Sequence, residues 1–136
     1  MITLTTRYKT ARCVLHRNGH FLLAVHSSFW RKTPRRWGLP GGGVEWGEKP
    51  EAAVRRELLE ELNFHVGALT PIGRFDYKRA AHMVYAAETD IHEFDWDDTE
   101  LVELRWFSMA EIEQLAEDQL LHAGYELDAV RAAARN

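Results

Sequence analysis

The sequence predicts an α/β or α+β sandwich in which a sheet packs against helices. Three observations support this. The chain has 136 residues, which is the size of one domain. Apolar residues make up 46% of it and charged residues 28%, a balance typical of soluble globular proteins. The expected order of elements is mostly strands, with one central helix and two late helices, and neither a helical bundle nor an all-β barrel fits this order.

A hairpin is the first expected element. Its strands cover residues 11–17 and 20–26, and both contain uninterrupted apolar runs that favour burial on two faces. The Asn18-Gly19 pair between them accepts the positive φ angles of a type I′ turn. Residues 27–43 are then expected to form a loop, which contains a basic stretch and ends in three consecutive glycines.

A helix is expected next, from Lys49 to Leu62. Pro50 suits the first helical turn, and residues 52–62 are strongly helix-forming. Asn63 follows directly. Asparagine is one of the few residues other than glycine that tolerate the left-handed conformation found just after a helix.

The second half of the chain predicts more strands and two further helices. The strands are expected over residues 64–77, 80–91 and 101–107. An acidic loop, residues 95–100, precedes the last of them. Ser108 caps a following helix, with Glu111 completing a capping box, and a last helix is expected over residues 125–135.

Charge, cysteine count and hydropathy exclude several classes of protein. There are 17 basic and 21 acidic residues, a net charge of −4, which argues against a general nucleic-acid-binding module. The single cysteine, Cys13, excludes an internal disulfide and suits a reducing compartment. No apolar run approaches the roughly 18 residues of a membrane span, and the N-terminus lacks the apolar region of a signal peptide. We therefore expect a cytoplasmic protein, monomeric or homodimeric, with no stable nucleic-acid partner and no membrane partner.

Three glutamates on the central helix point to metal chemistry. At about 100° per residue, Glu57, Glu60 and Glu61 lie near 0°, −60° and +40° and share one face. Carboxylates this close raise one another's pKa unless a cation lies among them, and oxygen ligands suit Mg²⁺ or Mn²⁺. The Gly41–Gly43 segment lets backbone approach a ligand closely, which favours phosphate chemistry. The alternative is an ordinary solvated acidic face whose ion-pair partners are local arginines.

The segment 42–64 resembles the signature of the Nudix hydrolases. That signature reads G-x5-E-x7-R-E-U-x-E-E-x-G-U, where U is a bulky apolar residue, and eight of its nine specified positions match this sequence. The one departure is Asn63 in place of glycine. If this position requires the left-handed conformation of a helix cap, asparagine can adopt it. Trp37-Gly-Leu-Pro-Gly-Gly and Leu104-Arg-Trp-Phe-Ser also resemble the surroundings of this signature in the family.

The resemblance implies a Nudix-like α/β/α sandwich with a mixed β-sheet and a loop–helix–loop motif, formed by one domain over residues 1–136. It also implies Mg²⁺-dependent hydrolysis, with Mn²⁺ as a substitute, of a pyrophosphate bond in a nucleoside diphosphate linked to another group. The residues that match the family's metal-binding groups are Glu57, Glu60 and Glu61, with the Gly41 carbonyl as a further ligand. Those that match its structural positions are Gly42 and the pair Glu48 and Arg56, which would brace the loop and orient the ligands.

A fourth acidic group is expected from outside this motif. In some members of the family, an acidic residue just before the late tryptophan-containing strand serves as ligand or general base. Glu100 is the preferred match, and Glu103 the second choice.

Substrate contacts are expected from basic and aromatic side chains in the loops. Arg35 and Arg36, within the basic stretch 31–36, could grip phosphates, and Trp46 and Trp96 could stack on a base. A solvated loop is the alternative in each case. The seven histidines show no metal-like spacing, and we expect them to be structural or solvated.

Two questions stay open at this point. The substrate could be a nucleoside triphosphate, a nucleotide sugar or a dinucleotide, because substrate choice depends on loops outside the motif. The alternative of a different class is a nucleotide-binding module that keeps the fold with little or no catalysis. The intact glutamates argue against this second alternative.

Overall fold

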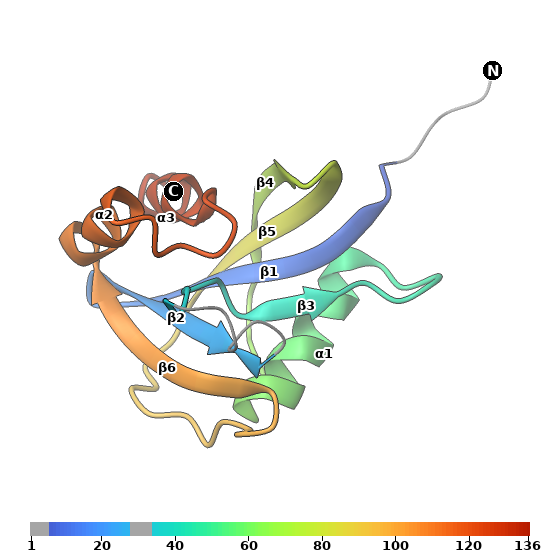
Figure 1. Cartoon of the computed structure of the whole chain (residues 1–136). Coiled ribbons are helices and arrows are strands. Elements are labelled where there is room, and N and C mark those ends of the chain that lie inside the picture. Colours follow the sequence, from blue (N-terminus) through green and yellow to red (C-terminus); the bar gives the residue numbers. More distant parts are fainter. Residues whose placement is uncertain (1–5, 28–33) are drawn as a thin grey trace.

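The computed structural model describes residues 6–27 and 34–136, which form a mixed sheet with helices on both faces (Figure 1). In chain order the elements are β1 (Tyr8–Arg17), β2 (His20–His26), β3 (Gly41–Gly43), α1 (Pro50–Leu62), β4 (Thr70–Tyr77), β5 (Ala80–Glu88), β6 (Leu101–Ser108), α2 (Met109–Glu117) and α3 (Glu126–Ala134). The strand order is β4-β5-β1-β2-β6, with β3 paired to β1. The β1–β5 pair is parallel and the others are antiparallel, so the predicted α/β/α sandwich with a mixed sheet is confirmed.

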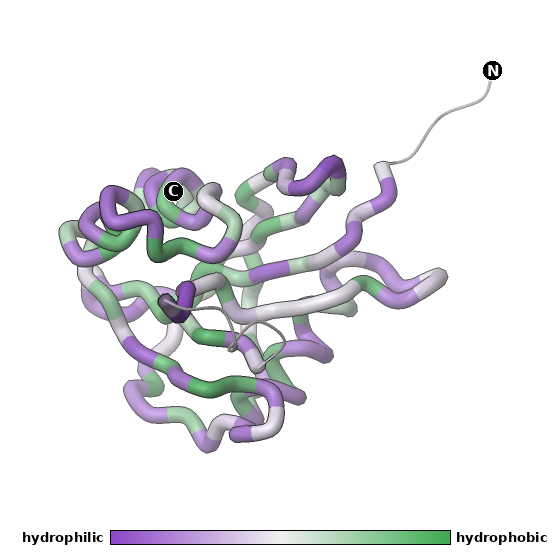
Figure 2. Tube along the Cα trace, in the orientation of Figure 1, coloured by the Kyte–Doolittle hydropathy of each residue, from purple (hydrophilic) through white to green (hydrophobic). Residues whose placement is uncertain are grey.

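Alternate residues of β1 enter two separate hydrophobic cores. Ala11, Cys13 and Leu15 pack under α1, whereas Val14 faces the core shared with α2 and α3. Figure 2 shows hydrophobic residues along the strands and hydrophilic ones along much of the connecting chain. In the described part of the chain, no helix is long and apolar enough to cross a membrane.

Three local predictions are confirmed by the structure. The β1–β2 turn has φ angles of 50° at Asn18 and 76° at Gly19, as a type I′ turn requires. Helix α1 ends at Asn63 in the left-handed region, with φ 51° and ψ 42°. Helix α2 begins with the full capping box of Ser108 and Glu111.

Three expected boundaries are wrong. Residues 27–43 were expected to be loop throughout, but Gly41–Gly43 forms β3, whose backbone pairs with β1 without needing any side-chain pattern. The strand expected from residue 64 begins only at Thr70, because the Arg55 guanidinium binds the carbonyls of Val66 and Gly67 and holds that segment against α1. The strand expected to reach residue 91 ends at Glu88.

Candidate active site

Strand β3 brings backbone close to the middle and last turns of α1, where its glycines meet Arg56, Glu57 and Glu61. Gly41, Gly42 and Gly43 pair with Arg12, Ala11 and Thr10 of β1. Gly41 has a φ of 130°, and a Cβ there would collide with the Ala11 carbonyl. Only glycine fits this close approach.

Gly42 makes room for the carboxylate of Glu57. A Cβ at Gly42 would lie 2.6 Å from the carboxyl carbon of Glu57 and 2.7 and 2.8 Å from its oxygens. The Glu57 side chain is only 13% exposed. The glycine of β3 and the glutamate of α1 therefore fit together as a pair.

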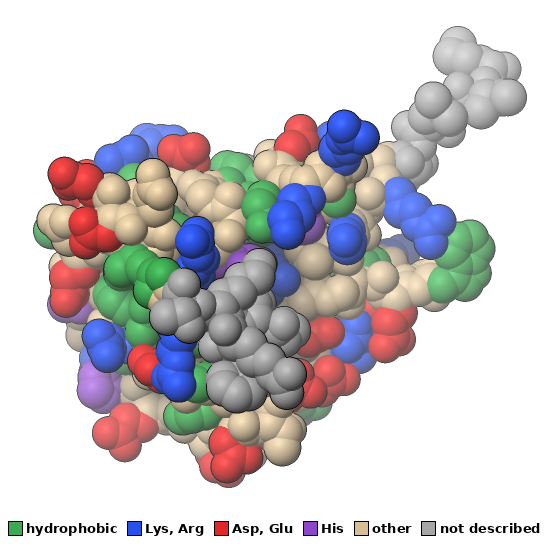
Figure 3. Space-filling model, viewed as in Figure 1, with side chains coloured by type: hydrophobic (Ala, Val, Ile, Leu, Met, Phe, Trp, Pro, Cys, Tyr) green, Lys and Arg blue, Asp and Glu red, His purple; other side chains and the backbone are tan. Residues whose placement is uncertain are grey.

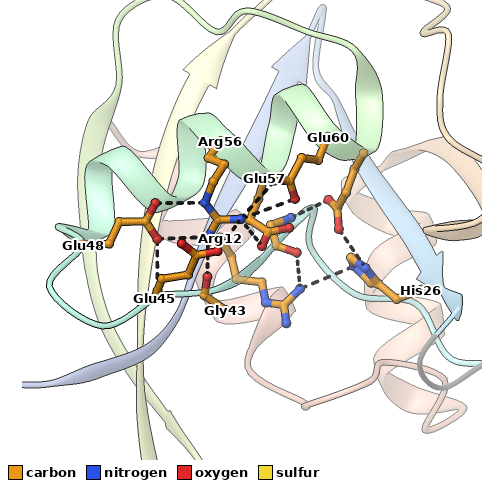
Figure 4. A network of polar contacts seen from close by, with 10 residues as sticks. Arg12, His26, Gly43, Glu45, Glu48, Arg56, Glu57 and Glu60 are labelled. Carbon is orange, nitrogen blue, oxygen red and sulfur yellow. Dashed lines mark hydrogen bonds and ion pairs between the residues drawn. The ribbon is translucent and has the colours of Figure 1, made fainter.

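Arg56 lies at the centre of the carboxylate network (Figure 4). Its Nε and Nη2 each donate to Glu48 at 2.9 Å, and Nη2 also donates to the Gly43 carbonyl at 2.8 Å. Its Nη1 donates to Glu57 at 3.0 Å and to Glu60 at 3.3 Å. The hydrogen bonds that Glu48 accepts, first from Arg56 and then from the Glu45 N–H, lower its pKa to about 2. Arg56 thus ties the loop before α1, strand β3 and two glutamates into one unit.

Glu61 is buried and hydrogen-bonded on both sides. Its Oε1 accepts the Gly41 N–H at 2.9 Å, and its Oε2 lies 3.2 Å from His26 Nδ1. Arg12 Nη1 donates to the Gly41 carbonyl at 2.9 Å and lies 3.4 Å from His26 Nε2. Glu61, Gly41, Arg12 and His26 therefore form a closed ring of contacts that holds the Glu61 carboxylate in place.

Negative charge in this network is incompletely compensated. The pKa of Glu57 is raised, first by burial and then by the charge of Glu61, while Arg56 acts in the opposite direction. Across the described residues, no group of three histidine, cysteine, aspartate or glutamate side chains is arranged to hold a metal ion. Glu61 is turned toward His26, and Arg56 lies between Glu57 and Glu60. The ligand chemistry nonetheless fits a hard divalent cation, because the glutamate carboxylates of α1 and the backbone carbonyls of the β3 glycines supply oxygen ligands and negative charge.

A pocket of about 230 Å³ lies on the other face of β1 and contacts the ring through Arg12 and His26. Its lining is rich in basic and aromatic side chains and comprises Lys9, Thr10, Arg12, His26, Gly38, Leu39, Tyr77, Lys78, His82, His122, Ala123, Tyr125 and Glu126. Sequence reasoning missed this pocket. The available signal was Arg12, a lone cation between the buried residues Ala11 and Cys13.

Histidine and tyrosine rings order the wall of this pocket. The Nδ1 of His82 lies 2.6 Å from Thr10 Oγ1, and its ring stacks on Tyr125 with centroids 5.9 Å apart. Burial lowers the pKa of His82 and raises that of Tyr125 to about 12. Three of the seven histidines, which were expected to be structural or solvated, line this one pocket.

The acidic loop before β6 reaches the C-terminal end of α1. The Asp97 N–H donates to the Glu61 carbonyl at 2.9 Å, and the Glu100 carbonyl accepts from Ser27 N–H at 2.9 Å. Glu100 is exposed and next to Leu101, which pairs with His26. The second choice, Glu103, is instead bound to Arg35 at 2.6 Å.

The other expected substrate contacts are dispersed. Arg36 lines a separate pocket that shares Tyr77 and His122 with the first one. Trp46 is 85% exposed, with the Arg7 guanidinium 4.6 Å from its ring. Trp96 packs against the α1-side core. Neither tryptophan lines the pocket of about 230 Å³ that contains Arg12. Arg31 and Lys32 of the basic stretch lie outside the described residues.

The sequence and the structure both resemble known proteins. A family model described as the NUDIX domain matches residues 6–126. A nucleoside triphosphatase NudI from Enterobacter sp. (strain 638) is 44% identical over 57 residues, which is 41% of this chain and 40% of that relative. The match therefore spans well under half the length of this curated relative.

Two solved structures extend the likeness over most of the chain. A MutT NUDIX hydrolase from Burkholderia pseudomallei is 28% identical, with a TM-score of 0.64 over 75% of this chain and 83% of that chain. A hydrolase of the NUDIX family from Clostridium perfringens has a TM-score of 0.74 at 20% identity, over 97% of this chain and 98% of that chain. The second likeness shows a shared fold.

Proposed function

The chain belongs to the NUDIX family, and from this membership we propose that it is a Mg²⁺-dependent hydrolase of the pyrophosphate bond in a nucleoside triphosphate. The observation that carries the proposal is the carboxylate network around Arg56, packed against the glycines of β3. Preference for a triphosphate over a nucleotide sugar or a dinucleotide rests on the likeness to a nucleoside triphosphatase.

The residues that would hold the divalent cation are Glu57 and Glu60, with Glu61 and the Gly41 carbonyl beside them. The raised pKa of Glu57 supports this. Burial is its largest cause and the charge of Glu61 the second, and a cation beside the carboxylate would stabilise its charged form. When bound, the cation supplies positive charge that offsets the charge of the substrate phosphates.

The protein's own groups position the carboxylates and activate water. Arg56 fixes Glu57 and Glu60 relative to β3, and the ring of Arg12, Gly41 and His26 fixes Glu61. In the reaction, a water oxygen forms a bond to phosphorus while the bridging P–O bond breaks. The water's proton passes to a carboxylate, for which Glu100 is our candidate, and the departing phosphate takes the electron pair of the broken bond.

Phosphate release from a panel of nucleotides, with and without Mg²⁺, tests the proposal. We expect nucleoside triphosphates to be hydrolysed in Mg²⁺ and not in chelator. Hydrolysis of nucleotide sugars alone would refute the substrate assignment. Nucleotide binding without any hydrolysis would favour the alternative of a binding module.

Thermal melting gives a second readout that does not depend on turnover. Mg²⁺ should raise the melting temperature of the parent, because a ligand that binds only the folded state stabilises it. Glu57→Gln should melt at a higher temperature than the parent in chelator, because the substitution removes a charge whose pKa the fold raises. The same variant should lose the Mg²⁺-dependent increase. If Mg²⁺ raised the melting temperatures of parent and variant equally, Glu57 would not be a ligand of the cation.

A further inference from the structure

Two hairpins of this sheet have turns of the same geometry but very different sequence. The β1–β2 turn uses Asn18 and Gly19, with φ angles of 50° and 76°. The β4–β5 turn, closed by the Tyr77–Ala80 pair, uses Lys78 and Arg79, with φ angles of 49° and 62°. Two successive positive φ angles define a type I′ turn, which strongly favours Asn-Gly. Long L side chains are disfavoured in this region, so the second turn retains backbone strain that the first avoids.

The strained turn places its two cations over two neighbouring pockets. Lys78 lines the pocket of about 230 Å³ together with Arg12 and Lys9. Arg79 lines a second pocket of about 570 Å³, and Lys9 lines both. The turn lies beside the start of β1, where Figure 3 shows Lys and Arg side chains gathered.

The charge of these two pockets is opposite to that of the chain as a whole. The chain carries −4, whereas the cations lining the two pockets are Arg7, Lys9, Arg12, Arg74, Lys78 and Arg79. Of these, Arg74 is paired with Asp76 at 2.8 Å. The one carboxylate in either lining, that of Glu126, accepts the N–H groups of Ala123 and Gly124. Of the ion pairs formed by the described residues, none involves Lys78 or Arg79. The Lys78 Nζ lies 5.4 Å from the centroid of the Tyr77 ring, a contact that does not neutralise its charge. The charges of Lys78 and Arg79 are therefore available to an anion.

We propose that the Lys78–Arg79 turn is an anion-binding turn that, with Lys9 and Arg12, grips the phosphate chain of the substrate. The inference rests on the proposed function, because it names the part of the substrate that this pocket recognises. Backbone strain persists where a functional requirement outweighs it. Here the requirement is two cationic side chains at positions where stability alone would favour asparagine and glycine.

The test uses inorganic tripolyphosphate as the probe, with divalent cations chelated, so that binding at the carboxylate network is disfavoured by like charge. Titration calorimetry on the full chain gives the Kd. Lys78→Gln/Arg79→Gln keeps two long side chains in the strained turn and removes both charges. We expect an unchanged melting temperature and a Kd about tenfold weaker, the size expected for lost charge-assisted hydrogen bonds.

Lys78→Asn/Arg79→Gly installs the preferred turn sequence. It should raise the melting temperature by about 5 °C and weaken tripolyphosphate binding as much as the double glutamine variant does. The matched control is Asn18→Gln/Gly19→Gln, in the turn at the other end of β1, roughly 30 Å away. The control should melt at a lower temperature and bind tripolyphosphate as the parent does.

Two outcomes would overturn the inference. One is no binding of tripolyphosphate by the parent at about 10 mM, and the other is equal binding by the parent and both Lys78/Arg79 variants. Nucleotide hydrolysis is measured on the same proteins to separate this inference from the proposed function. If the parent hydrolyses nucleotides and the double glutamine variant has the same KM, the proposed role of the Lys78–Arg79 turn is refuted and the proposed function is not. If the parent hydrolyses no nucleotide but binds tripolyphosphate, and the double glutamine variant binds it more weakly, the proposed function is refuted and the anion site is supported.

Discussion

Substituting Gly42 by alanine is expected to disable the site without unfolding the protein. The added Cβ would lie 2.6 Å from the carboxyl carbon of Glu57, whereas ordinary contacts begin near 3.4 Å. The Glu57 carboxylate must therefore move by about 1 Å. A misplacement of this size costs catalysis on the order of a hundredfold. The obstacle is the far end of a flexible side chain, and Gly42 is not among the glycines with positive φ. Stability should therefore change little.

The assay is kcat/KM for triphosphate hydrolysis at saturating Mg²⁺, with a thermal melt of each variant. Gly43→Ala is the matched control from the same strand. A Cβ there meets nothing within 4 Å, and its carbonyl still accepts from Arg56. We expect Gly43→Ala to retain activity within about threefold of the parent.

The reasoning would be refuted by equal activity of Gly42→Ala and Gly43→Ala. In that case Glu57 either tolerates the displacement or takes no part in the chemistry. A large drop in the melting temperature of Gly42→Ala would also contradict it, because the side chain would then be too constrained to move aside.

Three further predictions concern α1 and the acidic loop. Glu60→Gln should lower turnover at least about a hundredfold and melt as the parent does. Glu61→Gln should lower turnover similarly but also melt earlier, because its carboxylate is buried and bonded on both sides. Asn63→Gly should leave the free energy of unfolding unchanged or raise it slightly, whereas Asn63→Val should lower it by about 1 kcal/mol or more, because valine is disfavoured at a φ of 51°. A valine variant that melts at the same temperature as the parent would contradict this. Glu100→Gln should lower kcat more than it raises KM. If Glu100→Gln kept the parent's kcat and Glu103→Gln lowered it, Glu103 would be the general base instead.

The helix of the site was predictable because its signals are local. Pro50 at the start, the helix-forming run and Asn63 at the end all depend on residues adjacent in sequence, and the structure confirms both boundaries within one residue. The contact between Gly42 and Glu57 joins residues on different elements. A three-residue glycine strand carries no side-chain periodicity from which that pairing could be foreseen.

The pocket was not predictable from local signals, because its residues come from β1, β2, the β4–β5 turn and the segment before α3. Spacing along the chain does not show that His26, His82 and His122 line one cavity. Trp46 and Trp96 were predicted as stacking residues from their positions in the glycine loop and beside the acidic loop. The aromatic rings that line the cavity are those of Tyr77 and Tyr125, which lie at the ends of folded elements.

The net charge of −4 also conceals how charge is arranged. Acidic side chains from α1 and from the loop before it gather around Arg56, whereas basic ones line the two pockets near the β4–β5 turn. Arg12 joins the two regions, because it lines the first pocket and donates to the Gly41 carbonyl, whose own N–H holds Glu61. An anion drawn toward Arg12 would compete for the guanidinium that supports Gly41. One side chain and one peptide unit therefore connect the pocket to the Glu61 carboxylate.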